Sequence, residues 1–187
     1  MKRFLDLAGA LGGTVLLWPL AIVISIAIKL DSRGPAVFVQ RRVGRDERVF
    51  DCLKFRSMHV GAPERATHYS MQSDITRVGW VLRRTKLDEL PQLLNVLAGD
   101  MSLVGPRPCL PTQTALIEAR RSLGIFGVNP GITGLAQVNG IDMSQPERLA
   151  QVDAEYVVRA DTLMDMRLIF ASLPGLSRLR PKVRLPR

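Results

Sequence analysis

Cysteine, histidine and aromatic residues are scarce in this sequence of 187 residues. Cys52 and Cys109 are too few for a disulfide framework and lack the spacing of metal ligands, which indicates a reducing compartment. His59 and His68 stand alone, so no zinc site is expected. Aromatic residues make up only 5% of the chain and no RNA-recognition or zinc-finger pattern is present. Nucleic acid is therefore not an expected partner.

The sequence also has no internal repeat, no Walker loop and no GxGxxG motif, and its two histidines suggest no Ser-His-Asp constellation. What it has in excess is positive charge, with a formal net charge of +9. Such a balance indicates an anionic partner, either a membrane surface or a phosphorylated substrate. The length is sufficient for one domain with a core of its own.

The first 30 residues form a long apolar segment. Residues 4–28 are apolar except for Asp6, Ser25 and several small residues. As a helix this run would measure roughly 36 Å, which is enough to span a bilayer. The run is too long for a cleaved signal peptide and no small-x-small site follows it, so we expect residues 1–30 to stay attached.

Two features favour a membrane helix that enters and returns on the same face. Pro19 lies near the middle of the run, where a proline bends a helix. Lys2 and Arg3 precede the run, and Lys29 and Arg33 follow it, so both flanks have the positive charge typical of the cytoplasmic side. We therefore expect a re-entrant helix bent at Pro19 in preference to a kinked helix that crosses once.

The remaining patterns predict an α+β fold that is mainly helical, with a small β-hairpin, over residues 31–173. A disordered basic tail near anionic lipid is expected over residues 174–187. The last helix could belong to the core or lie in the membrane interface. The expected strands are 37–39 and 49–50, the expected helices are 75–84, 87–97, 112–123, 146–160 and 162–173, and the expected loops are 61–74, 104–108 and 129–134.

The predicted hairpin is strongly basic. A run of charges is usually a solvated surface, but this one directly follows a membrane segment, so contact with anionic lipid headgroups is expected at least as strongly. The basic residues are Arg41, Arg42, Arg45, Arg48, Lys54 and Arg56.

Asp88 and Glu89 are the strongest candidates for chemistry. Residues 83–86 supply three basic side chains just before them, and an apolar helix follows with Pro91 in its first turn. The two carboxylates would then lie at or beside the N-cap of that helix, where its dipole stabilises negative charge. A cap with an ion pair is one interpretation. The other is that Asp88 stays ionised and acts as a nucleophile or a magnesium ligand.

A second candidate is the loop at residues 104–108, which presents Arg107 between two prolines. The fork geometry of a guanidinium suits a phosphate. Lys54, Arg83 and Arg107 are the candidates for neutralising phosphate charge.

At this point the chain resembles the small, membrane-embedded phosphoglycosyl transferases of the bacterial sugar transferase family. The resemblance covers residues 4–173 and does not extend over the basic tail. It rests on the blocks LKFRSM (53–58), ITRVG (75–79), LDELPQL (87–93), GDMSLVGPRP (99–108), PGITG (130–134) and QVNG (137–140), together with Asp153, Tyr156, Val157 and Asp165.

The resemblance implies an enzyme of the bacterial inner membrane that initiates a glycoconjugate pathway. It would transfer a phosphosugar from a UDP-sugar to polyprenyl (undecaprenyl) phosphate, releasing UMP, at an active site on the cytoplasmic face surrounded by surface-lying amphipathic helices. Asp88 would be the nucleophile that forms a covalent intermediate in a ping-pong reaction, with Glu89 as acid/base partner and Mg²⁺ at Asp88. Arg56 and Gln92 lie in the matched blocks and join the expected substrate- and phosphate-binding residues.

The chain departs from the family pattern at Trp18, Lys86, Leu135 and Ile141. Leu135 stands where tryptophan is usual and Ile141 where arginine is usual, and the pair could signal a different sugar. A non-catalytic, membrane-anchored scaffold in a glycan-assembly complex stays an alternative to the enzyme. The identity of the sugar and the presence of a homodimer are left open.

Overall fold

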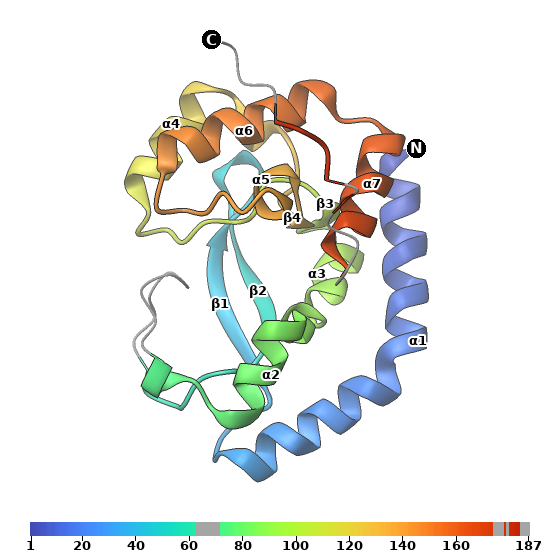
Figure 1. The fold of residues 1–187 in the computed structure, drawn as a ribbon, viewed down its shortest axis with the longest axis vertical. Coiled ribbons are helices and arrows are strands. Elements are labelled where there is room, and N and C mark those ends of the chain that lie inside the picture. Colours follow the sequence, from blue (N-terminus) through green and yellow to red (C-terminus); the bar gives the residue numbers. More distant parts are fainter. Residues whose placement is uncertain (63–71, 174–177, 179, 184–187) are drawn as a thin grey trace.

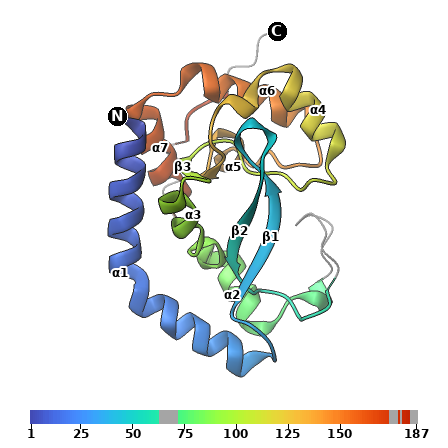
Figure 2. The same ribbon diagram turned by 180° about the vertical axis from the view of Figure 1, so that it is seen from behind.

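The computed structural model describes residues 1–62, 72–173, 178 and 180–183. A long bent helix runs along one edge, a two-stranded hairpin passes through the middle, and a group of helices gathers at one end (Figures 1 and 2). The elements are α1 (Lys2–Asp31), β1 (Val37–Val43), η1 (Arg45–Glu47), β2 (Val49–Phe55), η3 (Gln72–Asp74), α2 (Arg77–Thr85), η4 (Leu87–Glu89), α3 (Gln92–Ala98), β3 (Ser102–Val104), α4 (Thr114–Ser122), η5 (Ile125–Gly127), β4 (Gly131–Thr133), α5 (Leu135–Val138), α6 (Pro146–Arg159) and α7 (Thr162–Ser172).

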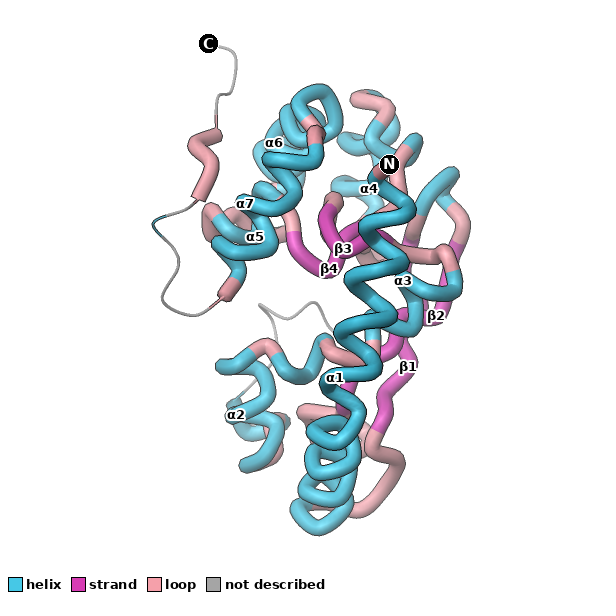
Figure 3. The backbone as a smooth tube through the Cα atoms, turned by 90° about the vertical axis from the view of Figure 1, so that its right-hand side faces the viewer, coloured by secondary structure: helices cyan, strands magenta, loops and turns pink. Residues whose placement is uncertain are grey.

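Helix α1 is continuous over 30 residues and contains Pro19. It bends near its middle (Figures 1 and 3). A proline removes one backbone hydrogen bond and crowds the preceding turn, which accounts for a bend without an interruption. The bend expected at Pro19 therefore lies within one continuous helix.

Helix α1 packs on the rest of the protein along one side only. Within the described residues it is the one helix long and apolar enough to cross a membrane. Phe4 is 73% exposed and Leu30 is 83% exposed, and other large apolar side chains between them are also uncovered. The buried positions are Asp6, Ala10, Ile24 and Ile28.

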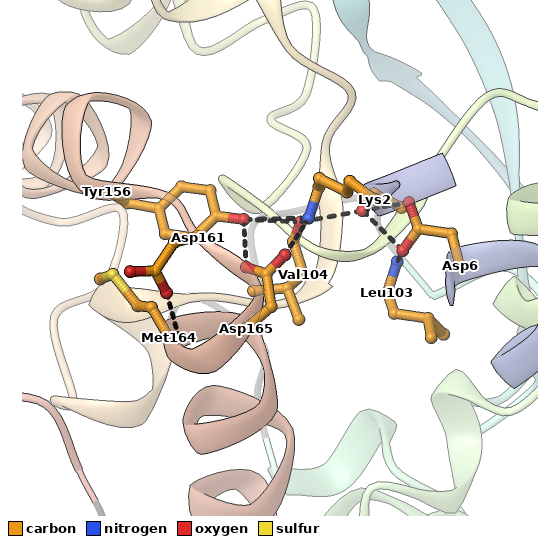
Figure 4. Close-up of polar contacts among 9 residues, drawn as sticks. Lys2, Asp6, Leu103, Val104, Tyr156, Asp161, Met164 and Asp165 are labelled. Atoms are coloured by element: carbon orange, nitrogen blue, oxygen red, sulfur yellow. Dashed lines mark hydrogen bonds and ion pairs between the residues drawn. The ribbon is translucent and has the colours of Figure 1, made fainter. Parts of the chain in front are cut away.

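The first turn of α1 is bonded to α6, α7 and β3 through the side chain of Lys2. Lys2 Nζ lies 2.6 Å from the Asp165 carboxylate and donates to the Val104 carbonyl at 3.0 Å. Tyr156 completes the cluster, donating its hydroxyl hydrogen to Asp165 at 2.8 Å (Figure 4). The positive flank therefore makes specific contacts with the domain that follows.

Two further residues of the same turn have partners of their own. Arg3 donates to the Val96 carbonyl at the end of α3, at 2.8 Å. The Asp6 carboxylate accepts from the Ser102 hydroxyl at 2.9 Å and from the Leu103 amide at 3.0 Å. These bonds hold the start of α1 against α3 and β3.

The far end of α1 contacts the same domain. Arg56, from the end of β2, donates to the carbonyls of Ser32 at 2.7 Å and Arg33 at 2.6 Å. Asp31 accepts from the Val78 amide, at the start of α2, at 3.0 Å. Both ends of the apolar helix are thus held by one globular unit.

The hairpin is longer than the sequence predicts. Strands β1 and β2 pair in antiparallel register from Val37 opposite Phe55 to Val43 opposite Val49. The prediction of an exposed basic surface on the hairpin, either solvated or in contact with lipid, is wrong for Arg42 and Arg56, which are buried. Because side chains alternate along a strand, Arg42 is buried inside the molecule while Arg41 is exposed.

A short parallel pair, β3 with β4, was not expected. Residues 129–134 were predicted to be a loop, but Gly131–Thr133 pairs with Ser102–Val104. The two chains approach closely at Gly105 and Gly131, where a Cβ on Gly131 would lie 2.0 Å from the Gly105 amide nitrogen. Each of these two strands has only three residues, and they are far apart in the sequence, so no local sequence pattern predicts that they pair.

The main hydrophobic core lies among α4, α5, α6 and α7, with smaller clusters under each half of α1. The five predicted helices appear within a few residues of their expected bounds, except the one that begins at residue 87. Helix α7 buries one side in the core and exposes Leu163 and Phe170 on the other.

Two predicted irregular segments lie partly outside the described residues. These are 63–71 of the predicted loop and most of the predicted tail. Within the described tail, Pro181 accepts a hydrogen bond from Asn139 at 3.1 Å and Val183 packs against the core. This part of the tail therefore contacts the domain.

We predict that Asp6→Ala lowers the free energy of unfolding by about 1–3 kcal/mol, because a buried amide and hydroxyl lose their acceptor. Asp51, which is exposed on β2, provides the control. Asp51→Ala is expected to change the free energy by less than about 0.5 kcal/mol. Denaturant unfolding in detergent micelles measures both, and equal values would contradict the anchoring role of Asp6.

Candidate functional site

Asp88 and Glu89 lie on a turn of their own between α2 and α3. Lys86 takes a left-handed conformation with φ 60°, which ends α2. The chain then makes one 3₁₀ turn, and α3 begins only after Pro91. The carboxylates were expected at or beside the N-cap of the helix; the N-cap is Pro91, and they precede it by three and two residues. Their charges are set by neighbouring side chains.

This turn borders a cavity of about 1420 Å³. Elements from the whole chain line it, including both halves of the hairpin, the end of α2, the Arg107 loop and α7. Cationic side chains outnumber carboxylates around it, as expected for a site that binds an anion. The charged lining residues are Arg42, Lys54, Arg56, Arg83, Lys86, Asp88, Glu89, Arg107 and Asp142.

Glu89 forms an ion pair with Arg107, from the loop after β3. Burial alone would raise the pKa of Glu89, but the charges of Arg107 and Lys54 outweigh it and lower the pKa below its usual value. Glu89 in turn raises the pKa of Arg107. The pair is thus held in its charged form.

Asp88 has a different environment from its neighbour. No side chain of the described residues donates a hydrogen bond to its carboxylate. Burial, followed by the negative charge of Glu89, raises the pKa of Asp88 to about 6, although Lys54 and Arg107 oppose this change. Neighbouring cations therefore favour the ionised form of Asp88, and burial disfavours it.

Lys54 faces the two carboxylates from β2. Burial, together with the charge of Arg107, lowers its pKa to about 8. Arg83 also lines the cavity, and its buried Nη1 atom has no hydrogen-bond partner among the described residues. Buried donors are normally satisfied. An anionic ligand in the cavity would supply the missing acceptor.

The structure adds Arg42, which the sequence reasoning did not select. Its guanidinium donates to the side-chain oxygen of Gln40 at 2.6 Å and to the Pro108 carbonyl at 2.9 Å. Burial and Arg107 lower the pKa of Arg42 to about 10. The signal was present in the hairpin, because strand alternation and the turn place Arg42 on the same face as Lys54.

Two of the predicted substrate-binding residues, Gln92 and Arg56, are not free to bind a ligand in the cavity as expected. Gln92 is buried and is not among the residues that line the cavity. Arg56 does line it, but four hydrogen bonds hold its guanidinium against the end of α1. Of the positions that depart from the family pattern, Leu135 is in the core and Ile141 borders the cavity.

Apolar residues of α1 and α7 contribute to the lining of the cavity, and we call them its apolar wall. Its members include Leu5, Ala8, Gly9, Leu17, Met166, Ile169 and Leu173. The cavity can therefore accommodate a charged group and an alkyl chain at the same time.

The donor set fits a magnesium ion only in part. Within the described residues no group of three or more His, Cys, Asp or Glu side chains could enclose a metal. Mg²⁺ is commonly bound through one or two carboxylates together with substrate phosphates and water. The Asp88 carboxylate, which accepts no side-chain hydrogen bond from the described residues, fits that pattern.

The chain is similar to proteins of known family. The family model described as bacterial sugar transferase matches residues 1–178. A protein of Caulobacter vibrioides named UDP-glucose:undecaprenyl-phosphate glucose-1-phosphate transferase is 40% identical over 185 residues, which cover 94% of this chain and 69% of that protein.

Two longer relatives are also similar. The undecaprenyl-phosphate glucose phosphotransferase of Komagataeibacter xylinus is 40% identical, over 92% of this chain and 35% of its own length. The UDP-N-acetylgalactosamine-undecaprenyl-phosphate N-acetylgalactosaminephosphotransferase of Aeromonas hydrophila is 35% identical, over 92% and 43%. The chain therefore spans less than half the length of these two relatives.

We predict that Asp88→Asn stabilises the protein near pH 7.5. The folded-state pKa of about 6 exceeds the usual value of 3.8, so folding is penalised when Asp88 is ionised in both states. The substitution should raise the free energy of unfolding by about 1–3 kcal/mol above pH 6, and it should leave the free energy unchanged below pH ~4. Denaturant unfolding, carried out once in each of these pH ranges, measures the difference, with Asp51→Asn as the exposed control. Stabilisation that is the same at both pH values would contradict the raised pKa.

Proposed function

The chain belongs to the bacterial sugar transferase family, and from this premise we propose that it transfers a phosphosugar from a UDP-sugar to undecaprenyl phosphate. The products would be undecaprenyl-diphosphate-sugar and UMP, and the reaction would initiate the assembly of a polysaccharide. Similar proteins are named for glucose and for N-acetylgalactosamine. The nucleotide and the lipid carrier are common to those names.

The observation that carries the proposal is the contrast between the adjacent carboxylates. Glu89 is paired with Arg107, while Asp88 is left without a side-chain donor in a cavity rich in cations. A carboxylate that is ionised but not neutralised by a partner is suited to nucleophilic attack. The surrounding cations are suited to a diphosphate.

In the proposed reaction Asp88 attacks the phosphorus that bears the sugar. A bond forms between its carboxylate oxygen and phosphorus, and the bond to UMP breaks. The phosphate of the lipid then attacks the same phosphorus and releases Asp88. Glu89 accepts the proton of that phosphate, and Lys54, Arg83 and Arg107 balance the charge of the transferred group. One site thus serves a soluble donor and a lipid acceptor in turn.

Asp88 is the residue proposed to hold Mg²⁺ with the donor diphosphate. When bound, the ion would neutralise negative charge on the phosphates. The residues of the chain bind and orient the same group: Arg83 has an unsatisfied buried donor, and Lys54 and Arg107 lie beside the carboxylates.

The acceptor fits the apolar wall. That wall begins with α1 residues such as Leu5 and Leu17 and lies in the same cavity as Asp88. A polyprenyl chain can lie along it while the phosphate reaches the cations, since apolar surface favours the chain and charge favours the phosphate.

We further propose that α1 is re-entrant and that the site lies at the cytoplasmic face of the bacterial inner membrane. A helix that crosses once has its ends on opposite sides of the bilayer. Here Lys2 at one end and Asp31 at the other both contact the same globular unit. A charged domain does not extend through a bilayer, so these contacts favour a helix that returns to its own side.

The activity is tested by Asp88→Asn. We expect this variant to lose UMP release by at least about 10³-fold, because the amide is a poor nucleophile, while it still inserts into the membrane. UMP is measured with a panel of UDP-sugars, undecaprenyl phosphate and Mg²⁺. Near-normal release by the variant would refute the assignment of Asp88.

The topology is tested by cysteine labelling. The native Cys52 and Cys109 are buried, so the unaltered chain serves as the background. One cysteine is placed ahead of Met1 and another replaces the exposed Arg33. We expect an impermeant maleimide to label both from the cytoplasmic side in inverted vesicles and neither in intact spheroplasts. Labelling from opposite sides would refute the re-entrant helix.

A further inference from the structure

The loop that carries Arg107 is held by two cations besides its contact with Glu89. The Arg107 carbonyl accepts a hydrogen bond from Arg120 Nη1 at 2.8 Å. The next carbonyl, that of Pro108, accepts from Arg42 Nη1 at 2.9 Å. Two successive carbonyls of a loop without regular secondary structure are therefore bound by guanidinium groups from α4 and β1.

Arg120 is itself held by Asp153. Nε and Nη2 of Arg120 lie 3.1 and 2.7 Å from one oxygen of Asp153, on α6. The two side chains are 2% and 3% exposed. Removing a charged group from water costs several kcal/mol for each charge. A protein in which apolar residues of similar volume replace a buried ion pair is often equally stable. A contribution to the folding free energy therefore does not by itself explain why Arg120 and Asp153 are buried here.

The geometry indicates a specific use for the pair. One edge of the guanidinium contacts Asp153, and this leaves Nη1 directed at the Arg107 carbonyl. Because the guanidinium is planar and rigid, fixing one edge fixes the other. A lysine ammonium has no second edge and cannot reproduce both contacts.

We propose that Arg120 is a positioning residue for the proposed transferase reaction, and that it acts by holding Arg107 in place against Glu89, with Asp153 fixing its orientation. The inference rests on the proposed function only for its kinetic consequence. Neither Arg120 nor Asp153 lines the cavity, so neither touches a substrate in it. Reacting groups need support from surrounding side chains to keep their geometry.

The first test is Arg120→Lys, which keeps a buried cation beside Asp153. We expect kcat for UMP release to fall about tenfold while the KM for the UDP-sugar changes less than about twofold, because a misplaced Arg107 affects the transition state more than donor binding. Arg121→Lys is the matched control. Arg121 is the next residue of α4 and pairs with Glu47 at the surface. An unchanged kcat in Arg120→Lys would overturn the proposal.

A double-mutant cycle separates positioning from a general effect on the fold. In an Arg107→Ala background the side chain that Arg120 positions is gone, so Arg120→Lys should reduce kcat by less than about twofold further. A further tenfold loss would show that Arg120 acts otherwise and would overturn the proposal. If Arg120→Lys does not fold, Asp153→Asn is used in the same cycle, with the same expected result and the same contrary one.

Hydrogen exchange measured by mass spectrometry keeps the inference distinct from the proposed function. We expect Arg120→Lys to increase exchange in peptides covering residues 103–110, and Arg121→Lys to leave it unchanged. Unchanged exchange in Arg120→Lys would overturn the positioning role whatever reaction the protein catalyses. Absence of UMP release by the wild type, with exchange increased in the variant, would contradict the proposed function alone.

Discussion

The ion pair between Arg107 and Glu89 is the contact on which the site depends. It joins the loop after β3 to the turn between α2 and α3. It also makes the two adjacent carboxylates different, because Glu89 is neutralised locally while Asp88 is not. Any movement of Arg107 would change the charge seen by both carboxylates and by Lys54. The frame around that loop therefore matters as much as the charged groups.

That frame is built from contacts between distant segments. The pairing of β3 with β4 holds one side of the loop, and the close approach of Gly105 to Gly131 leaves no room for a side chain. Asp88 and Lys54 are poorly solvated, since burial is the largest cause of the shifts in their pKa values. Such a site is stable only when surrounding structure restrains it.

Helix α1 combines two roles that sequence patterns usually assign to separate segments. Its outer face has the exposed apolar side chains of a membrane segment, and its inner face supplies a wall of the cavity. Its ends are bound by polar contacts to one globular unit. In the proposed reaction, a lipid acceptor would approach the charged residues along this apolar helix.

The sequence by itself determined the elements whose cause is local. The apolar run with Pro19 predicts a bent helix, the turn at 44–47 predicts a hairpin, and the spacing of leucines predicts the helix that Gly99 ends, although α3 begins at Gln92 and not at residue 87. The tertiary structure alone decided the pairing of β3 with β4, the use of Arg56 at the end of α1, the contact of Arg42 with the Pro108 carbonyl and the pair of Arg120 with Asp153. Each joins residues separated by more than 20 positions, and contacts at that range leave no periodic signal in the chain. Asp88 and Glu89 were recognised as a pair, but only their neighbours in space set their different charges.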